Sequence, residues 1–277
     1  MIFIYKKWDS FCKQLSDKGI QSIPACEVSS AKGKYLVLKH DVETNVSTAY
    51  EMAKAEQRYG HRGSYYVQAY LLRDEKNIEL LKKMQSMGHE ISYHYDVLDS
   101  CKGDFEKAFL TFEANKQLFE KSGFTLKTVC QHGNPIVERV GYTSNRDFFR
   151  SEKIQLRYPE IADIMVDFKT KYLTDYGYIS DAGRQFKLIF DPINNDIVNS
   201  DDKNIAFENL DKVFKAVSSS NESYIISTHP HRWQRSAIIY SLKHIFFRVI
   251  KLIAKTLARI PIVKKIMSKY YYLAKNI

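Results

Sequence analysis

The chain has 277 residues, of which 44% are hydrophobic, so it can hold one large α/β domain or two small ones. Its formal net charge of +10 is concentrated at one end: residues 231–277 contain 11 Lys and Arg and no Asp or Glu. The preceding residues carry 31 basic and 32 acidic side chains, so the body of the chain is nearly neutral. A charge confined to one end argues against a nucleic-acid-binding body, and no nucleic-acid partner is expected.

The beginning of the chain places lysines and Asp9 where a secretory signal would have its apolar centre. No secretory signal is therefore expected. The four cysteines show no Cys-x-x-Cys spacing; they are Cys12, Cys26, Cys101 and Cys130. We expect reduced thiols that serve packing, in a cytoplasmic protein.

Helical and strand patterns alternate along the chain. In chain order they predict a helix from Asp9 to Lys18, a strand from Tyr35, a helix from Val46 to Tyr59, a strand at Tyr65–Val67, and helices after Asp74 and after Asp104. Such alternation indicates parallel βαβ units. Residues 145–172 have poor periodicity and contain Pro159, so helix and irregular loop are expected there. Two helices, Ser236–Ile260 and Val263–Ala274, are expected around Pro261.

Five short apolar runs end in histidine or aspartate. The residues at these ends are His40-Asp41, His94-Tyr95-Asp96, Gln131-His132-Gly133, Asp181 and His229-Pro230-His231. In a parallel β/α barrel the carboxyl ends of the strands converge on one face. The sequence therefore predicts a distorted (β/α) barrel with its polar residues around one cavity; these are His40, Asp41, His94, His132, Asp181 and His229.

Carboxylate and imidazole side chains suit zinc and other divalent transition metals. Asp41 or Asp181 alone would more often be a turn or helix-capping residue. Their clustering with histidines reverses that preference. A shared metal requires the side chains of Asp41 and His94 to lie within about 8 Å of each other.

From Tyr35 to Trp233 the chain resembles the polysaccharide deacetylase superfamily, the carbohydrate esterases with a NodB homology domain. The family's first motif is Thr-Phe-Asp-Asp, and here it is Leu38-Lys39-His40-Asp41. The resemblance implies that Asp41 is a metal ligand and that His40 replaces the base. Gly88-His89-Glu90-Ile91 matches the second motif and implies that His94 is a ligand, while Leu98 stands at the second histidine position.

Two residues are candidates for the third ligand. Asp96 lies two residues after His94, so it shares a face with His94 if the strand continues. His132 ends the next strand, in Gln131-His132-Gly133-Asn134-Pro135, which resembles a divergent branch associated with surface-polysaccharide gene clusters. We favour His132, because Asp96 is also suited to capping the following turn.

The late motifs of the family are also present. Ile226-Ser227-Thr228-His229 resembles Leu-x-x-His, which implies that His229 is the general acid, and Asp181 resembles the carboxylate that orients it. Substrate contacts are expected from Gln131, Asn134, Arg184 and Trp233.

The resemblance implies a metal-dependent hydrolase, with Zn²⁺ as the expected metal, that removes an N-acyl group from an amino sugar during O-antigen or capsule biosynthesis. The alternative is a non-catalytic carbohydrate-binding or scaffolding protein. It is motivated by His40 in place of the family's aspartate and Leu98 in place of its histidine.

We expect a barrel over residues 1–233 and a basic amphipathic helical tail over 234–277. In this tail, His244, Arg248, Lys251, Lys255 and Arg259 recur at helical spacing beside an apolar face. No stretch of about eighteen residues is free of Lys or Arg, so the tail is too charged to span a bilayer. It suits an anionic membrane interface, which predicts a peripheral protein on the inner membrane face, with a lipid-linked sugar as one candidate substrate. The alternative is a helix packed on the barrel or in an oligomer.

Overall fold

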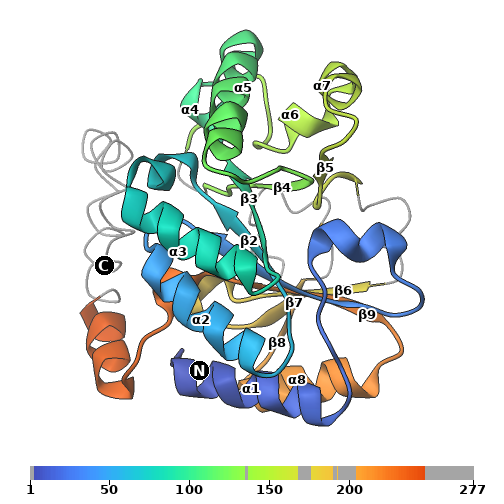
Figure 1. The fold of residues 1–277 in the computed structure, drawn as a ribbon, viewed down its shortest axis with the longest axis vertical. Coiled ribbons are helices and arrows are strands. Elements are labelled where there is room, and N and C mark those ends of the chain that lie inside the picture. Colours follow the sequence, from blue (N-terminus) through green and yellow to red (C-terminus); the bar gives the residue numbers. More distant parts are fainter. Residues whose placement is uncertain (1–2, 135–136, 168–175, 190–191, 193–203, 247–277) are drawn as a thin grey trace.

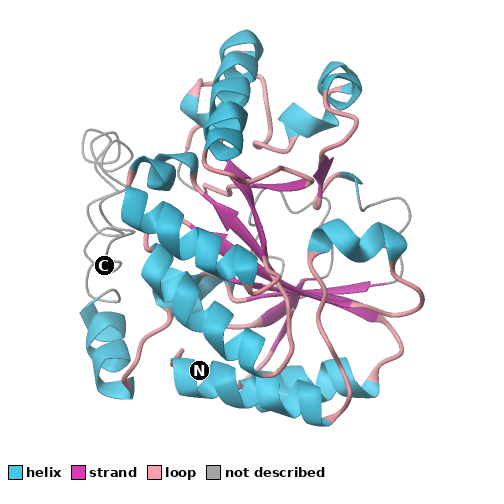
Figure 2. Cartoon of the chain, in the orientation of Figure 1, coloured by secondary structure: helices cyan, strands magenta, loops and turns pink. Residues whose placement is uncertain are grey.

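The computed structural model describes residues 3–134, 137–167, 176–189, 192 and 204–246. Its strands form a single sheet in the order β5-β4-β3-β2-β1-β9-β6-β7-β8. They are β1 (Leu36–Val42), β2 (Ser64–Val67), β3 (Glu90–Tyr95), β4 (Thr128–Gln131), β5 (Ala162–Asp163), β6 (Tyr176–Ser180), β7 (Lys187–Ile189), β8 (Ile205–Ala206) and β9 (Ser223–Thr228). Figure 2 shows these strands with the helices around them.

The sheet is parallel from β5 to β6, and only β7 and β8 add antiparallel pairs at one edge. The predicted α/β class with parallel strands is therefore confirmed. Closure of a barrel is not confirmed, because in the described part of the chain β5 and β8 stand at opposite ends of the strand order.

The helices are α1 (Tyr5–Asp17), α2 (Val46–Arg58), α3 (Glu75–Ser86), α4 (Val97–Ser100), α5 (Phe105–Lys121), α6 (Asp147–Arg150), α7 (Glu152–Arg157) and α8 (Leu210–Ser219). Short 3₁₀ segments cover Ala25–Ser30, Ala69–Arg73, Ala182–Arg184 and Pro230–Arg232. Helix α2 lies between α1 and α3 along the sheet, and α8 lies beside α1 (Figure 1).

Most predicted helices are confirmed. The side chains of Asn45, Asp74 and Asp104 accept backbone N–H bonds in the first turns of α2, α3 and α5. Helix α1 begins at Tyr5 rather than at Asp9, because Trp8 already belongs to its buried face. Residues 145–167 contain α6, α7 and the unpredicted strand β5.

The sheet has two faces, which alternate residue by residue along each strand. On β1, Leu36 and Leu38 face α1, α2 and α8, and we call this side the outer face. Val37 packs instead with Tyr66, Cys130 and Ile225, and we call this side the inner face. The polar residues of the candidate site follow the same alternation.

The two ends of the described chain meet beside the sheet. Ile4 pairs with Gln234, and the ring of Phe3 lies 5.1 Å from that of Trp233. Residues 237–246 then form a helix, which agrees with the first part of the predicted tail. The rest of Ser236–Ile260, and all of Val263–Ala274, lie outside the described residues. No helix among the described residues is long and apolar enough to cross a bilayer.

Candidate active site

Asp41 stands at the centre of a buried polar cluster on the inner face. The ammonium of Lys39, two residues earlier on β1, donates to both Asp41 carboxylate oxygens at 2.5 and 2.6 Å, and to Ser227 Oγ at 3.1 Å. Burial raises the pKa of Asp41, but Lys39, His94 and His229 together lower it below its ordinary value. Asp41 is therefore ionised and held in place by Lys39.

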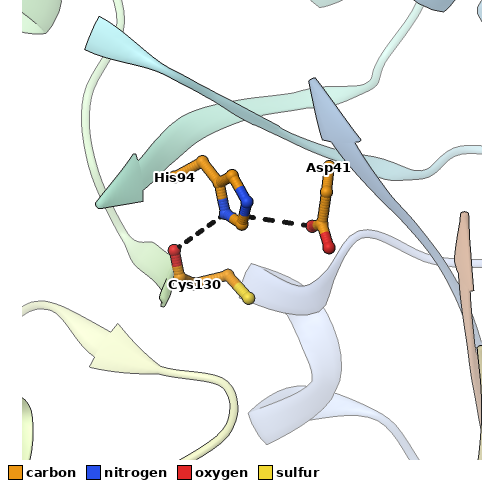
Figure 3. Close-up of side chains that lie close together, drawn as sticks. All are labelled: Asp41, His94 and Cys130. Atoms are coloured by element: carbon orange, nitrogen blue, oxygen red, sulfur yellow. Dashed lines mark hydrogen bonds and ion pairs between the residues drawn. The ribbon is translucent and has the colours of Figure 1, made fainter. Parts of the chain in front are cut away.

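His94 and His132 meet beside this pair. His94 Nδ1 lies 4.0 Å from Asp41 Oδ1 and 3.1 Å from the carbonyl oxygen of Cys130 (Figure 3). His94 Nε2 lies 3.1 Å from His132 Nδ1, which in turn lies 3.3 Å from Glu43 Oε1. The predicted proximity of Asp41 and His94 is confirmed, and His132 joins them.

Three of these side chains fit a divalent metal: Glu43, His94 and His132. Their ligand atoms lie within 4.8 Å of one another, and all three residues are buried. Tetrahedral bonds of about 2.0–2.2 Å place ligand atoms about 3.3–3.5 Å apart, close to the two separations given above. Because a carbonyl can accept only from His94 Nδ1–H, the lone pair of His94 lies on Nε2, which faces His132. Burial lowers the pKa of His94 to about 3, so this imidazole is neutral, as a ligand must be.

A second group, Asp41 with His94 and Cys130, satisfies the same distance limit. It fits a metal less well, because both oxygens of Asp41 already accept from Lys39. Burial also raises the pKa of the Cys130 thiol, which keeps it protonated. The chemistry of the donors therefore favours Glu43, His94 and His132.

His229 follows β9 and is held by Asp181 from β6. Its Nδ1 lies 2.5 Å from Asp181 Oδ1, and its backbone N–H donates to Asp181 Oδ2 at 3.0 Å. Arg232 donates to the same carboxylate at 3.1 Å. Burial raises the pKa of Asp181, but His229 and Arg232 lower it to about 2, so Asp181 is ionised. His229 Nε2 is then directed at the cluster, 3.7 Å from Asp41 Oδ2 and 3.9 Å from Glu43 Oε1.

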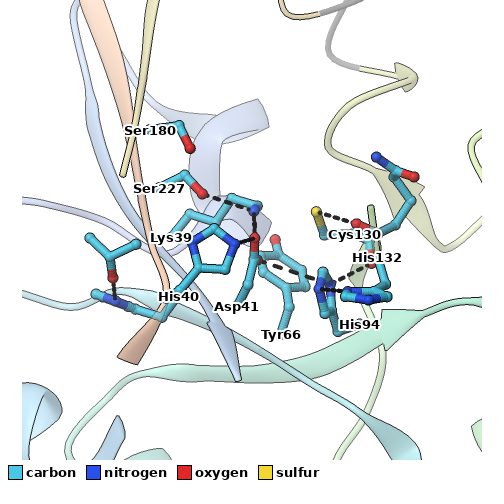
Figure 4. Close-up of polar contacts among 12 residues, drawn as sticks. Lys39, His40, Asp41, Tyr66, His94, Cys130, His132, Ser180 and Ser227 are labelled. Carbon is cyan, nitrogen blue, oxygen red and sulfur yellow. Dashed lines mark hydrogen bonds and ion pairs between the residues drawn. The ribbon is translucent and has the colours of Figure 1, made fainter. Parts of the chain in front are cut away.

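The structure does not bring His40 into this cluster, and we correct its expected position. His40 follows Lys39 and precedes Asp41, so the strand directs its side chain to the outer face. There its Nε2 lies 3.0 Å from Glu56 Oε1, its Nδ1 lies 2.7 Å from Thr228 Oγ1, and its ring stacks on Tyr65. Figure 4 shows the labelled His40 turned away from His94 and His132.

Asp96 is absent from both candidate metal groups formed by the described residues. The expected alternation from His94 does not reach it, because β3 ends at Tyr95 and Asp96 has φ −136° and ψ 28° at the N-terminus of α4. Leu98 lies in the apolar core within α4.

The four expected substrate-binding residues occupy different environments. Trp233 is fully buried between Phe3 and Trp8, which removes it from any substrate surface. Arg184 is partly buried, and its backbone N–H donates to the Asp181 carbonyl. Gln131 and Asn134 flank His132 and are partly buried, so a substrate role for these two residues stays a prediction.

Sequence reasoning missed Lys39 and Glu43. Both differ from Asp41 by two positions, and for Lys39, which lies on β1, that spacing predicts a shared face. Glu43 lies one residue beyond β1, so its position depends on the turn that follows the strand.

No protein-family model and no curated protein matches the chain. Among solved structures, it is similar to a mutant of the peptidoglycan deacetylase PdaC from Bacillus subtilis, with 12% identity and a TM-score of 0.38 over 71% of this chain and 88% of that one. It is also similar to the Bdellovibrio bacteriovorus peptidoglycan deacetylase Bd3279, with 14% identity and a TM-score of 0.37 over 84% of this chain and 54% of that one. Similarities at this level assign no activity.

Proposed function

We propose that the protein is a metal-dependent hydrolase that removes an N-acyl group, most simply acetyl, from an amino sugar. The observation that carries this proposal is the directed histidine: Asp181 holds His229 so that Nε2 faces both Asp41 and Glu43. His229 can act as an acid and Asp41 as a base, on either side of the metal-binding group Glu43, His94 and His132. This arrangement is suited to hydrolysis of an amide.

The proposed roles follow from position. Glu43, His94 and His132 would hold a divalent cation, with Zn²⁺ as the first candidate and Fe²⁺ as the second. Such a cation supplies Lewis acidity toward a carbonyl oxygen and lowers the pKa of water. Asp41 is the carboxylate placed to accept a proton from water, and Lys39 holds both of its oxygens. His229 is placed to donate a proton to the departing amine, because Asp181 holds its Nδ1 and leaves Nε2 facing the cluster.

The finer assignment concerns the substrate. We propose an amino sugar of a cell-surface polysaccharide, such as O-antigen or capsule, on the basis of the Gln131-His132-Gly133-Asn134-Pro135 segment and its resemblance. The His132 carbonyl accepts from Asn145 Nδ2 at 2.8 Å, and Arg139 donates to the Asn134 carbonyl at 2.9 Å. Residues 132–134 are therefore held beside the cluster, where a bound sugar would meet them.

The scaffolding alternative loses its motivation in this geometry. It depended on the missing aspartate at His40 and the missing histidine at Leu98, but Asp41, Glu43 and His132 supply a carboxylate base and two further donors. A protein that only binds carbohydrate has no need for a histidine fixed by a buried ionised carboxylate.

The test combines metal analysis with acyl release. The purified protein is loaded with Zn²⁺ or Fe²⁺ and incubated with N-acetylated amino-sugar oligomers, and released acetate is measured. His229→Ala is expected to lower acetate release by about 10²–10⁴-fold while leaving the metal content unchanged. His231→Ala is the control, because its ring centroid lies 6.0 Å from that of His229 and its Nδ1 has no hydrogen-bond partner among the described residues. Metal-free protein, or equal acetate release by His229→Ala, would support the scaffold.

A further inference from the structure

The helix at residues 237–246 presents an apolar face to solvent. Its exposed large hydrophobic side chains occupy one stripe at helical spacing; they are Ile238, Ile239, Leu242, Ile245 and Phe246, with exposed fractions between 46% and 73%. Monomeric soluble proteins rarely expose so many neighbouring large apolar residues. We call these five residues the apolar stripe.

The helix is held against the domain by its other side. Tyr240 is buried, its ring lies 5.9 Å from that of Phe3, and it stacks on His244 one turn later. These two contacts leave the apolar stripe facing outward. In a water-soluble packing helix the apolar residues would be the ones turned inward.

The charge of the surrounding sequence indicates which kind of partner suits the stripe. From Arg235 to Ile277 the chain contains ten Lys and Arg and no Asp or Glu. A second copy of this segment, or the chain's own continuation, would bring further Lys and Arg close to those already beside the stripe, and these charges repel one another. An anionic lipid surface offers both hydrocarbon for the stripe and negative charge for the basic residues.

We propose that the apolar stripe docks on the headgroup boundary of an anionic membrane, to which the positive charge of this segment is attracted. The helix then lies in the interface and does not span the bilayer, in keeping with its charge. This places the protein on a membrane face rich in anionic lipid, such as the inner face of the cytoplasmic membrane.

The apolar stripe lies close to the candidate site along the sequence. Ala237 is the eighth residue after His229, and eight residues span at most about 29 Å. A docked helix therefore keeps His229 near the lipid headgroups. If the proposed deacylation holds, a lipid-linked amino sugar is the substrate class within reach.

The test measures sedimentation of the full chain with vesicles of phosphatidylcholine alone or with 30% phosphatidylglycerol. Binding is expected only to the anionic vesicles, and it should weaken as salt screens the basic residues. The double variant Ile238→Gln, Leu242→Gln removes two side chains of the stripe that are 73% and 64% exposed. Its partition coefficient should fall by about tenfold or more, because each side chain loses its burial in the acyl boundary.

The matched control is Leu110→Gln, Leu156→Gln, whose side chains are 66% and 75% exposed on α5 and α7. It should bind vesicles as the parent does, which separates the stripe from hydrophobicity in general. Equal binding by both double variants, or equal binding to neutral and anionic vesicles, would overturn the proposal. So would the absence of vesicle binding together with concentration-dependent dimers that Leu242→Gln abolishes in sedimentation velocity. None of these outcomes depends on acetate release, so failure of the proposed activity would be seen separately.

Discussion

At the scale of single residues, the site is built on strand alternation. Lys39 and Asp41 share the inner face of β1, and Glu43 reaches the same cluster from one residue beyond the strand, whereas His40 faces Glu56. Residues 39–43 thus supply one ammonium and two carboxylates to one side, and a histidine paired with Glu56 to the other. Because Asp41 is held by Lys39 whereas Glu43 lies beside His132, the roles of Asp41 and Glu43 can be separated experimentally.

Substitutions at these two positions should divide metal binding from catalysis. Glu43→Gln is expected to weaken divalent-metal affinity by at least about 100-fold, since removal of supporting groups alone costs 10–100-fold. Asp41→Asn should retain the metal but lower acetate release by about 10²-fold or more. Metal titration with a competing chelator, alongside the acetate assay, measures both effects. Loss of metal from Asp41→Asn but not from Glu43→Gln would instead support the group of Asp41, His94 and Cys130.

At the scale of elements, the sequence predicts the alternating strands and helices better than it predicts the start of α1 or the short strands β5, β7 and β8. The predicted strands that carry Asp41, His94, His132, Asp181 and His229 are all present, because apolar runs between capped helices are strong local signals. The start of α1 was missed because no side chain caps it and tertiary burial of Trp8 decides it. Strands β5, β7 and β8 have two or three residues each, too few for a periodic signal.

The sequence could not predict the positions of candidate site residues that lie beyond the ends of strands. Asp96 satisfied the spacing rule, but β3 ended one residue too early for that rule to apply. Trp233, four residues after His229, was expected to contact substrate. Its large apolar surface is instead buried against Phe3, which lies 230 residues earlier. Such outcomes are set by contacts distant in sequence, which no local pattern contains.

Asp163, at the end of β5, is a buried carboxyl group whose effect on the free energy of unfolding depends on pH. Asp163 Oδ1 accepts the N–H groups of Met165 and Val166, and Oδ2 accepts from the Tyr95 hydroxyl. Burial raises the pKa of Asp163 to about 6, so the folded state prefers the protonated acid. The stabilising effect of this group is therefore full below pH 4 and is lost as the pH rises through about 6.

Asp163→Asn should remove that dependence. The amide oxygen can accept the same two backbone N–H bonds, but it does not ionise. Relative to the parent, the free energy of unfolding of the variant should rise by about 3 kcal/mol between pH 4 and pH 7. Urea unfolding at both pH values measures this difference. A difference that stays constant with pH would show that Asp163 is ionised in the folded protein throughout.

At the scale of the whole molecule, the proposed metal would tie together segments from three strands. Glu43 follows β1, His94 lies in β3 and His132 follows β4. An ion bound only by the folded protein stabilises it in proportion to the logarithm of its free concentration over Kd. If the cluster holds the proposed metal, metal availability will affect the global stability of the protein.

Thermal unfolding should reveal this coupling. With free Zn²⁺ at 1,000 times Kd, the folded protein gains about 4 kcal/mol, which should raise Tm by about 10 °C. Chelation should reverse the shift. Glu43→Gln should show almost no shift, and His40→Gln, on the outer face, should retain it despite a lower starting Tm. An identical response of the parent and Glu43→Gln would place the stabilising ion elsewhere.

The position of β1 between β2 and β9 also has a consequence in time. During synthesis, β1 pairs early with β2, but its other edge is completed by β9, which ends 186 residues after Val42. At about 5–20 residues per second, the ribosome takes about 10–40 s to make that stretch. For this interval the strand carrying Asp41 has an open edge, which can pair with other nascent chains. Growth conditions that slow translation should therefore lower the soluble yield more than they do for proteins whose central strands pair with near neighbours in sequence.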